Sequence, residues 1–358
     1  MSIPVSSLLT RIIIQPETAL ALELTEWDLL IRQARRSNVL AKLAYLLEDL
    51  QLIDNVPEHP RRHLLSTQVH AQRFSISLDW EIECINQALT DLQVPVVFLK
   101  GTAYHVAENQ AGRGRVFSDV DILVPEAMIA DVEIALVKAG WMTSTFAAYD
   151  QKYYREWMHE IPPLRHLKRQ TSIDVHHNIL PKTCRFCPDA SKLLAQAVKI
   201  PGTEHWVLSP EDRVLHSAAH LFYGGEFDQG FRDLTDLHFL LKEFAETDGF
   251  WPRLQERATK LNQQIALHYA LRYTRLILQT SMPDSMFHEG QAGIKQRWMD
   301  ALFLRALQPN HVSCSGKWTG LACWLLFVRS HWLKMPWYLL LPHLFRKTRM
   351  KFAGESQH

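Results

Sequence analysis

Three short runs that contain β-branched apolar residues, in the middle of the chain, constrain its fold most strongly. They span residues 94–99, 120–124 and 172–176, and each is rich in β-branched residues. Runs of this kind are typical of strands buried on both faces of a sheet. Helical periodicity at 102–110 and 126–139 separates the runs, and strands that alternate with helices indicate an α/β layer. The sequence therefore predicts a central sheet with helices packed against it.

Helical patterns dominate on both sides of this unit. Apolar residues recur at helical spacing from about residue 17 to residue 92, which indicates three or four helices, the last of them long and starting near residue 61. Beyond residue 208 the pattern is helical again, because Ser209 suits a helix cap and Pro210 a first turn. We expect an N-terminal helical region at 1–93, an α/β unit at 94–200, a C-terminal helical domain at 201–310 and a distinct segment at 311–358.

Composition excludes several classes of protein. Of the 358 residues, 47% are hydrophobic and 22% are charged, with a formal net charge of +1, which fits neither a fibrous nor a disordered chain. Five scattered cysteines are too few for a disulfide framework, so we expect a cytoplasmic protein. The most apolar C-terminal run, at 318–328, is too short for a membrane-spanning helix.

Acidic side chains cluster where two of the apolar runs begin. Asp119 and Asp121 stand at the start of the second run, and period-two alternation points both to one face of a strand. Asp174 stands at the start of the third run. If the two strands are neighbours, the three carboxylates converge. Such a cluster suits a hard cation such as Mg²⁺, and two such ions can clamp an in-line displacement at phosphorus.

The first apolar run leads directly into a helical pattern through Lys100, Gly101 and Thr102. Glycine permits close backbone approach, and a helix N-terminus offers free amide donors to a phosphate. Lys100 adds a cation, and Arg113 and Arg115 could add more. The alternatives are that Gly101 only makes a tight turn and that Lys100 and Arg115 form surface ion pairs of small value.

The segment 98–128, FLKGTAYHVAENQAGRGRVFSDVDILVPEAM, resembles the signature of the uncharacterised nucleotidyltransferase family within the DNA polymerase β-like superfamily. Family members show a Lys-Gly pair after a strand, an Arg four residues before an Asp-x-Asp-x-Leu-Val strand, and later an acidic residue before a His. The matching residues here are Lys100, Gly101, Arg115, Asp119, Asp121, Leu123, Val124, Asp174 and His176. Flanking stretches, including DLTDLHFLL at 233–241, are also similar, so the likeness spans about 24–278.

The resemblance implies a polymerase β-like nucleotidyltransferase palm, a small mixed sheet with helices, between the helical regions. It implies transfer of an NMP from an NTP, with ATP among the candidates, to an acceptor hydroxyl with release of pyrophosphate. Asp119 and Asp121 would be catalytic ligands of the metal–NTP complex, and Asp174 would complete a second Mg²⁺ or Mn²⁺ site. Lys100, Gly101, Thr102 and Arg115 would seat the nucleotide, although the wider superfamily has Gly-Ser where this chain has Gly101-Thr102.

Other functions fit the same features. A catalytically idle nucleotide- or partner-binding regulator could keep the fold, although the presence of all three acids favours an enzyme. The sequence leaves the acceptor open among a small molecule, a sugar, a protein side chain and an RNA end.

The C-terminal segment has an unusual charge distribution. Residues 301–354 contain eight basic residues and no acidic one, interspersed with Trp and Leu, whereas the remainder carries 31 basic and 38 acidic residues. One interpretation is a pair of helices packed against the acidic remainder of the same protein. The others are a peripheral membrane contact and a surface for RNA or an acidic partner.

Further cysteines and histidines suggest metal ligands only weakly. Cys184 and Cys187 follow His176 closely and could bind zinc with it, but no second Cys pair follows, so two free thiols are favoured. His216 and His220 lie one helical turn apart, and we expect core or polar-network histidines there.

Overall fold

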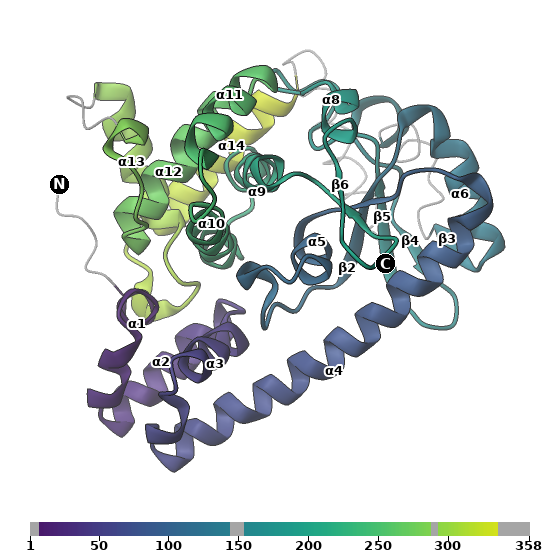
Figure 1. Cartoon of the computed structure of the whole chain (residues 1–358). Helices are drawn as coiled ribbons and strands as arrows, with labels where there is room; N and C mark the ends of the chain where they lie inside the picture. The colour runs from purple at the N-terminus through teal and green to yellow at the C-terminus, as the bar shows by residue number, and fades with distance from the viewer. Residues whose placement is uncertain (1–6, 144–153, 288–292, 336–358) are drawn as a thin grey trace, which may run out of the picture.

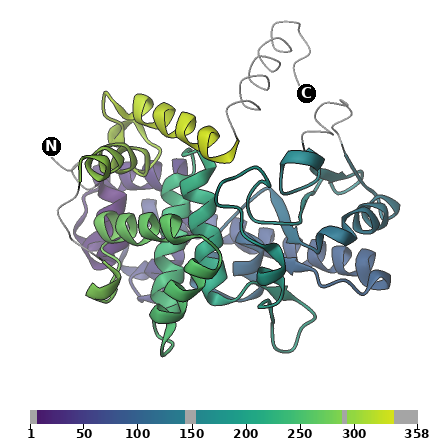
Figure 2. The same ribbon diagram turned by 90° about the horizontal axis from the view of Figure 1, so that it is seen from above.

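A computed structural model describes residues 7–143, 154–287 and 293–335 of the chain. Figure 1 shows a mixed α+β architecture in which a sheet lies at one end of the molecule and helices gather at the other. The same division is visible from above in Figure 2. The basic residues at 346, 347, 349 and 351 lie outside the described part of the chain.

The sheet is mixed and has seven strands in the order β3-β4-β5-β2-β1-β7-β6. Its strands are β1 (Val97–Phe98), β2 (Asp119–Leu123), β3 (Trp141–Thr143), β4 (Leu164–His166), β5 (Ser172–His176), β6 (Val198–Lys199) and β7 (Trp206–Val207). β2 runs parallel to β5 and antiparallel to β1. The expected strands at 120–124 and 172–176 are confirmed, and their apolar side chains are buried. The sheet continues to Val207, beyond the boundary expected at residue 200.

The first apolar run forms a shorter strand than expected. Only Val97 and Phe98 pair with neighbouring strands, whereas the run spans 94–99. Pro95 has no backbone N–H to donate to a ladder, so pairing starts after it. The strand is nevertheless fully buried, since Val97 and Phe98 are both 0% exposed.

The N-terminal region is helical, as predicted. It contains α1 (Leu8–Ile14), α2 (Leu24–Arg36), α3 (Leu40–Asp49) and the long α4 (Glu58–Leu89). α4 begins slightly before residue 61, because Pro60 lies in its first turn, where the missing N–H costs no helical hydrogen bond. α4 packs on α2 and α3 near its start and on α6 (Ile129–Lys138) of the sheet region further along, so it spans the two ends of the molecule (Figure 1).

Two helices connect the first three strands. α5 (Lys100–Val106) follows β1 directly and is shorter than the pattern at 102–110 predicts, because a turn and the short 3₁₀ helix η4 (Gln110–Gly112) replace its second half. α6 (Ile129–Lys138) follows β2. Gly140, which follows the helical pattern at 126–139 in the sequence, lies just beyond the end of α6 with a φ of 103°, a left-handed conformation that favours glycine at a helix end.

The rest of the described chain is almost entirely helical. It contains α8 (Ala190–Leu194), α9 (Pro210–Gly224), α10 (Gly230–Phe244), α11 (Phe250–Lys260), α12 (Gln264–Leu278), α13 (Ile294–Ala306) and α14 (Thr319–Lys334). Ser209 caps α9 by accepting a hydrogen bond from the amide of Asp212, as expected. No described helix combines the length and apolar character needed to cross a membrane.

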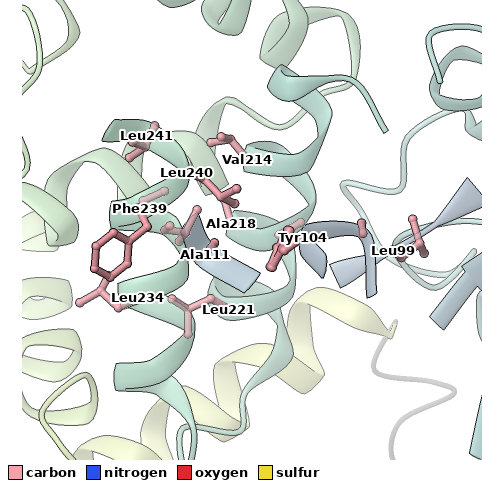
Figure 3. Packing of buried hydrophobic residues seen from close by; sticks show 14 of the residues in the cluster. Leu99, Tyr104, Ala111, Val214, Ala218, Leu221, Leu234, Phe239, Leu240 and Leu241 are labelled. Carbon is pink, nitrogen blue, oxygen red and sulfur yellow. The ribbon is translucent and has the colours of Figure 1, made fainter. Parts of the chain in front are cut away.

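The packing of α5 and η4 against α9 and α10 joins the sheet region to the C-terminal helices. Figure 3 shows Tyr104 and Ala111 from the first pair inserted among apolar side chains of α9 and α10. Ala111, Val214, Ala218 and Leu240 are all completely buried. Full burial of a Val or Leu side chain contributes roughly 1.5–3 kcal/mol, so this contact fixes where the end of β1 lies relative to α10.

A buried ion pair joins the N-terminal helices to the same place. Lys42 of α3 donates to the carboxylate of Asp236 on α10 at 2.6 Å and to the carbonyl of Ala111 at 2.7 Å. The Lys42 side chain is 6% exposed and that of Asp236 is 2% exposed. Burial alone would raise the pKa of Asp236, but Lys42 and Arg115 lower it, so the carboxylate stays ionised.

We predict that Lys42→Met lowers the free energy of unfolding by about 3 kcal/mol, because breaking a buried pair leaves a charge uncompensated. Urea denaturation followed by circular dichroism measures the change. Arg32→Met is the control, since Arg32 pairs with Asp28 on the exposed face of α2 and its loss should change stability little. Equal stability of the two variants would contradict a joining role for Lys42.

Candidate active site

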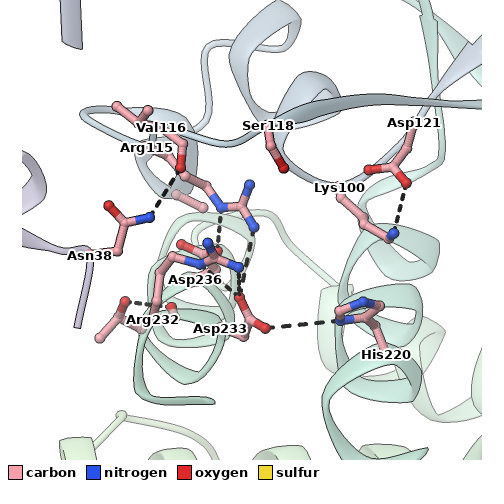
Figure 4. A network of polar contacts seen from close by, with 12 residues as sticks. Asn38, Lys100, Arg115, Val116, Ser118, Asp121, His220, Arg232, Asp233 and Asp236 are labelled. Carbon is pink, nitrogen blue, oxygen red and sulfur yellow. Dashed lines mark hydrogen bonds and ion pairs between the residues drawn. The ribbon is translucent and has the colours of Figure 1, made fainter. Parts of the chain in front are cut away.

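A cavity of about 540 Å³ lies where the sheet region meets α9 and α10. Four of the residues selected from the sequence line it, namely Lys100, Arg115, Asp119 and Asp121. The helices add Ser217, His220, Gln229, Arg232, Asp233 and Asp236. The cavity wall thus combines acidic and cationic side chains from segments that are distant in the sequence (Figure 4).

The parallel pairing of β2 with β5 brings the predicted carboxylates together. Asp121 lies opposite Asp174 in the register, and Asp119 lies opposite Ser172. Ligand atoms of Asp121, Asp174 and His176 all lie within 4.8 Å of one another. The expectation that the two strands are neighbours is therefore confirmed. Asp121 and Asp174 come together, whereas Asp119 is not part of this group of ligand atoms.

The two facing carboxyl groups have opposite pKa shifts. Burial, followed by the charges of Asp121 and Glu160, raises the pKa of Asp174 to about 7. Burial alone would also raise the pKa of Asp121, but Lys100 and His176 lower it well below its usual range. Asp121 is therefore ionised, whereas Asp174 holds a proton near neutral pH unless a further cation compensates the local negative charge.

Lys100 is the cation that compensates the charge of Asp121 within the protein. Its Nζ donates to Asp121 Oδ1 at 2.7 Å, and His176 Nε2 lies 2.9 Å from the same oxygen. Both contacts use Oδ1, so Oδ2 can bind a metal ion without breaking either. The Lys100 side chain is 21% exposed, so the pair is not the exposed surface pair considered from the sequence.

The backbone at Lys100 is strained. Its φ of 47° places a residue with a side chain in the left-handed region. Such a conformation costs on the order of 1 kcal/mol or more, and it is concentrated at functional sites. Here it occurs where β1 ends and α5 begins, beside the paired acids.

Gly101 gives Arg115 room to reach α10. A Cβ at this position would lie 2.1 Å from Nη1 of Arg115 and 2.7 Å from the ring of Phe117, so no other residue fits without movement. Arg115 Nε donates to Asp236 Oδ2 at 2.7 Å, and its Nη2 lies 3.7 Å from Asp233 Oδ1. Gly101 is therefore required for close packing, in addition to the turn considered from the sequence.

Thr102 lies beneath the surface of the site. It is 1% exposed and does not line the cavity. Its hydroxyl makes no hydrogen bond within the described residues. Contact between this hydroxyl and a phosphate would therefore require local movement of α5.

The sequence reasoning did not select the residues that α10 contributes. Arg232 Nη2 lies 2.8 Å from Asp233 Oδ1, and His220 Nδ1 lies 3.9 Å from Asp233 Oδ2. Figure 4 shows Arg115, Arg232 and Asp233 meeting on one side of the view, with Lys100 and His220 on the other. The signal that could have identified them was the DLTDLHFLL stretch, which resembles the family but was not assigned a role.

The other cysteines and histidines selected from the sequence lie outside the paired acids. Cys184 and Cys187 form no disulfide, and no cysteine belongs to a candidate metal-ligand group in the part of the chain that the structure describes. His216 is buried in α9, and His220 takes part in the polar network of the cavity.

The chain belongs to a family of uncharacterised nucleotidyltransferases, whose sequence profile matches residues 23–279. The matched part contains the sheet and all the cavity residues named above, and the family supports the class of transferases. A comparison with curated proteins finds no match.

We predict that Mg²⁺ binds more tightly as the pH rises through about 7. A bound cation needs Asp174 ionised, so below the raised pKa the affinity should fall by up to tenfold per pH unit. Isothermal titration calorimetry from about pH 6 to about pH 8 measures this dependence.

Asp174→Asn should bind Mg²⁺ weakly and without this pH dependence. Asp284→Asn is the matched control, because the Asp284 side chain is 95% exposed. A wild-type affinity that does not change with pH would show that Asp174 is not a ligand.

Proposed function

We propose that this protein is a metal-dependent nucleotidyltransferase with a polymerase β-like palm, which transfers an NMP from an NTP to an acceptor hydroxyl and releases pyrophosphate. One observation carries the proposal. Asp121 and Asp174 face each other on parallel strands, and Asp121 shares the wall of a cavity with the cations that a triphosphate requires. The acceptor is a small molecule, a sugar, a protein side chain or an RNA end.

The acidic residues fit a divalent metal ion. Burial and then the neighbouring acidic groups raise the pKa of Asp174, and a bound cation would relieve the repulsion between these acids. Oxygen ligands from carboxylates suit Mg²⁺ or Mn²⁺, and we assign Asp119, Asp121 and Asp174 as the ligands. Bound there, the metal would neutralise charge on the triphosphate and favour deprotonation of the attacking hydroxyl.

Cationic side chains of the cavity would hold the nucleotide. Lys100, Arg115 and Arg232 all line it, so the phosphates of an NTP such as ATP can be bound between the strands and α10. Arg115 is held by its hydrogen bond to Asp236, and the absence of a side chain at Gly101 leaves space for its guanidinium group. These fixed charges would stabilise the negative charge that develops as pyrophosphate leaves, without covalent chemistry by the protein.

A regulator that binds nucleotide without turning it over is the alternative function. The Lys100–Asp121 contact favours this regulator, because the ammonium group of Lys100 already compensates the charge of Asp121. The raised pKa of Asp174 favours the enzyme, because Lys100 leaves the negative charge around that group only partly compensated.

We predict that the purified full-length protein transfers label from at least one α-labelled NTP, with Mg²⁺ or Mn²⁺ and a cell extract as the source of acceptor. Asp121→Asn and Asp174→Asn should each lower transfer by at least about 100-fold, because each removes charge that organises the reaction. Asp284→Asn should retain full transfer, since Asp284 is exposed and does not line the cavity.

Nucleotide binding separates the two functions. Binding of NTP without transfer by a folded wild-type protein would support the regulator. If the folded protein bound no NTP, both functions would be contradicted.

We further propose that α14 contacts an anionic membrane surface, consistent with a cytoplasmic, membrane-peripheral protein. One face of α14 packs on α9 and α13 through Ala322 and Leu326. The opposite face exposes large apolar side chains, namely Trp318, Leu321, Trp324, Phe327, Val328 and Trp332. A helix that is apolar on both faces is normally covered on both.

Charge and residue type favour lipid as the partner of this face. Residues 301–335 contain basic side chains and no acidic one, which complements anionic headgroups. Tryptophan is enriched at membrane interfaces, where its ring enters the headgroup region. Packing of α14 on the rest of the protein, the first interpretation from the sequence, accounts for its buried face only.

We predict that the full-length protein floats with vesicles of phosphatidylcholine and phosphatidylserine but not with phosphatidylcholine alone. Trp324→Ser combined with Trp332→Ser should abolish flotation, because both side chains are exposed on the proposed contact face. Trp80→Ser is the matched control, since Trp80 is 62% exposed on α4. Dimerisation through α14 without flotation would contradict the membrane contact.

A further inference from the structure

A second group of potential metal ligands lies beside the paired acids. It consists of His159, Glu160 and His176, each of which offers one ligand atom, and the three atoms lie within 4.8 Å of one another. The proposed nucleotidyl transfer assigns no role to His159 or Glu160. The group differs from the Asp121–Asp174 pair in having two imidazoles, which are ligands for transition metals rather than for Mg²⁺.

Backbone pairing fixes the group in place. Glu160 forms an isolated antiparallel bridge with His176 at the end of β5. The amide of Ile161 donates to the carbonyl of Val175 at 3.1 Å, and the amide of His177 donates to the carbonyl of His159 at 2.8 Å. The three side chains therefore come from two segments that are held side by side. Backbone hydrogen bonds place the group without the help of a bound ion.

The distances resemble those within a coordination shell. His176 Nδ1 lies 3.2 Å from Glu160 Oε2, and the two imidazole rings have centroids 5.1 Å apart. With bond lengths of about 2.1 Å, neighbouring ligand atoms around a tetrahedral ion lie about 3.4 Å apart. Small rotations of the His159 side chain would complete three ligands around one ion.

A buried nitrogen atom without a partner points to a missing ligand. Nδ1 of His159 is buried and makes no hydrogen bond within the described residues, whereas Nδ1 of His176 is buried and faces Glu160 Oε2 at 3.2 Å. A buried polar atom without a partner costs roughly 1–3 kcal/mol, so such atoms are rare. The His176 side chain is 1% exposed, which leaves water little access to its ring.

The other nitrogen of His176 has the partner that metal-binding histidines usually have. Nε2 lies 2.9 Å from Asp121 Oδ1. A metal-bound histidine commonly donates its second ring N–H to a carboxylate, which fixes the ring and its tautomer. In this arrangement His176 binds the ion through Nδ1 and donates to Asp121 through Nε2.

We propose that His159, Glu160 and His176 bind a divalent transition-metal ion of the Zn²⁺ class, separate from the Mg²⁺ or Mn²⁺ of the paired acids. Two histidines and one carboxylate leave a fourth position for water or another ligand. Through its contact with Asp121, the bound His176 is a positioning residue that holds this carboxylate toward the cavity. The proposal does not depend on the nucleotidyltransferase activity.

Uptake of Co²⁺ by the chelator-treated full-length protein tests the site, because Co²⁺ reports its ligands through visible absorption. In the presence of excess Mg²⁺, we expect one tightly bound Co²⁺ per chain. His159→Ala should weaken binding at least tenfold, since even loss of a residue that only supports a ligand costs about 10–100-fold. Zn²⁺ should displace the Co²⁺ spectrum.

Two controls make the result specific. His268→Ala changes an exposed histidine on α12 and should leave Co²⁺ binding unchanged. Asp174→Asn disrupts the paired acids and should also retain it. His159→Gln replaces His159→Ala if the alanine variant fails to fold by circular dichroism.

Other outcomes would overturn the proposal. Equal Co²⁺ affinity of the wild type and the His159 variant would show that His159 is not a ligand. Loss of Co²⁺ binding in Asp174→Asn, or its displacement by Mg²⁺, would place the ion among the paired acids instead.

Discussion

The carboxylate of Asp236 is the interaction on which the arrangement of this molecule most depends. It lies on α10, almost fully buried, and is bonded by Lys42 from α3 and by Arg115 from the segment before β2. Three parts of the chain that are distant in sequence thus share one buried charge. Since an uncompensated charge in this position is costly, each part constrains the placement of the other two. The wall of the cavity is one result of that constraint.

A second set of charges, on the neighbouring strands β2 and β5, has a different character. Asp121 is compensated by Lys100 and His176, whereas Asp174 remains among acids and holds its proton. Structural ion pairs are normally balanced, as the pair of Lys42 and Asp236 is. An excess of negative charge on a buried face is instead typical of sites that bind a cation. Asp121 shares the cavity wall with Arg115 and Arg232, so this acid lies near the cations that we propose to bind phosphate.

His176 links the two groups of potential metal ligands. One ring nitrogen faces Asp121 and the other faces Glu160. An ion bound beside Glu160 would therefore affect the position of Asp121 through a single rigid ring. The short backbone pairing between residue 160 and β5 makes this possible. The catalytic proposal and the additional metal site therefore rest on the same strand but on different chemistry: oxygen ligands on one side of His176 and mainly nitrogen ligands on the other.

Much of the fold and part of the site could be predicted from the sequence. The strands at 120–124 and 172–176, the helix cap at Ser209 and the glycine at 140 were predictable because each depends on local preferences and on periodicity. The shared face of Asp119 and Asp121 follows from the same alternation of side chains. The predicted length of the first strand was wrong. Pro95 has no N–H to donate, and only Val97 and Phe98 pair with neighbouring strands.

The sequence by itself determined which acidic residues of β2 and β5 are the candidates for chemistry, since that information lies in spacings of two to four residues. Only the tertiary structure decided which groups meet them. The partners of Arg115 lie 118 and 121 residues away on α10, and those of His176 include Glu160 across an isolated bridge. Contacts at such separations arise from the packing of whole elements around a common core. No local pattern encodes that packing.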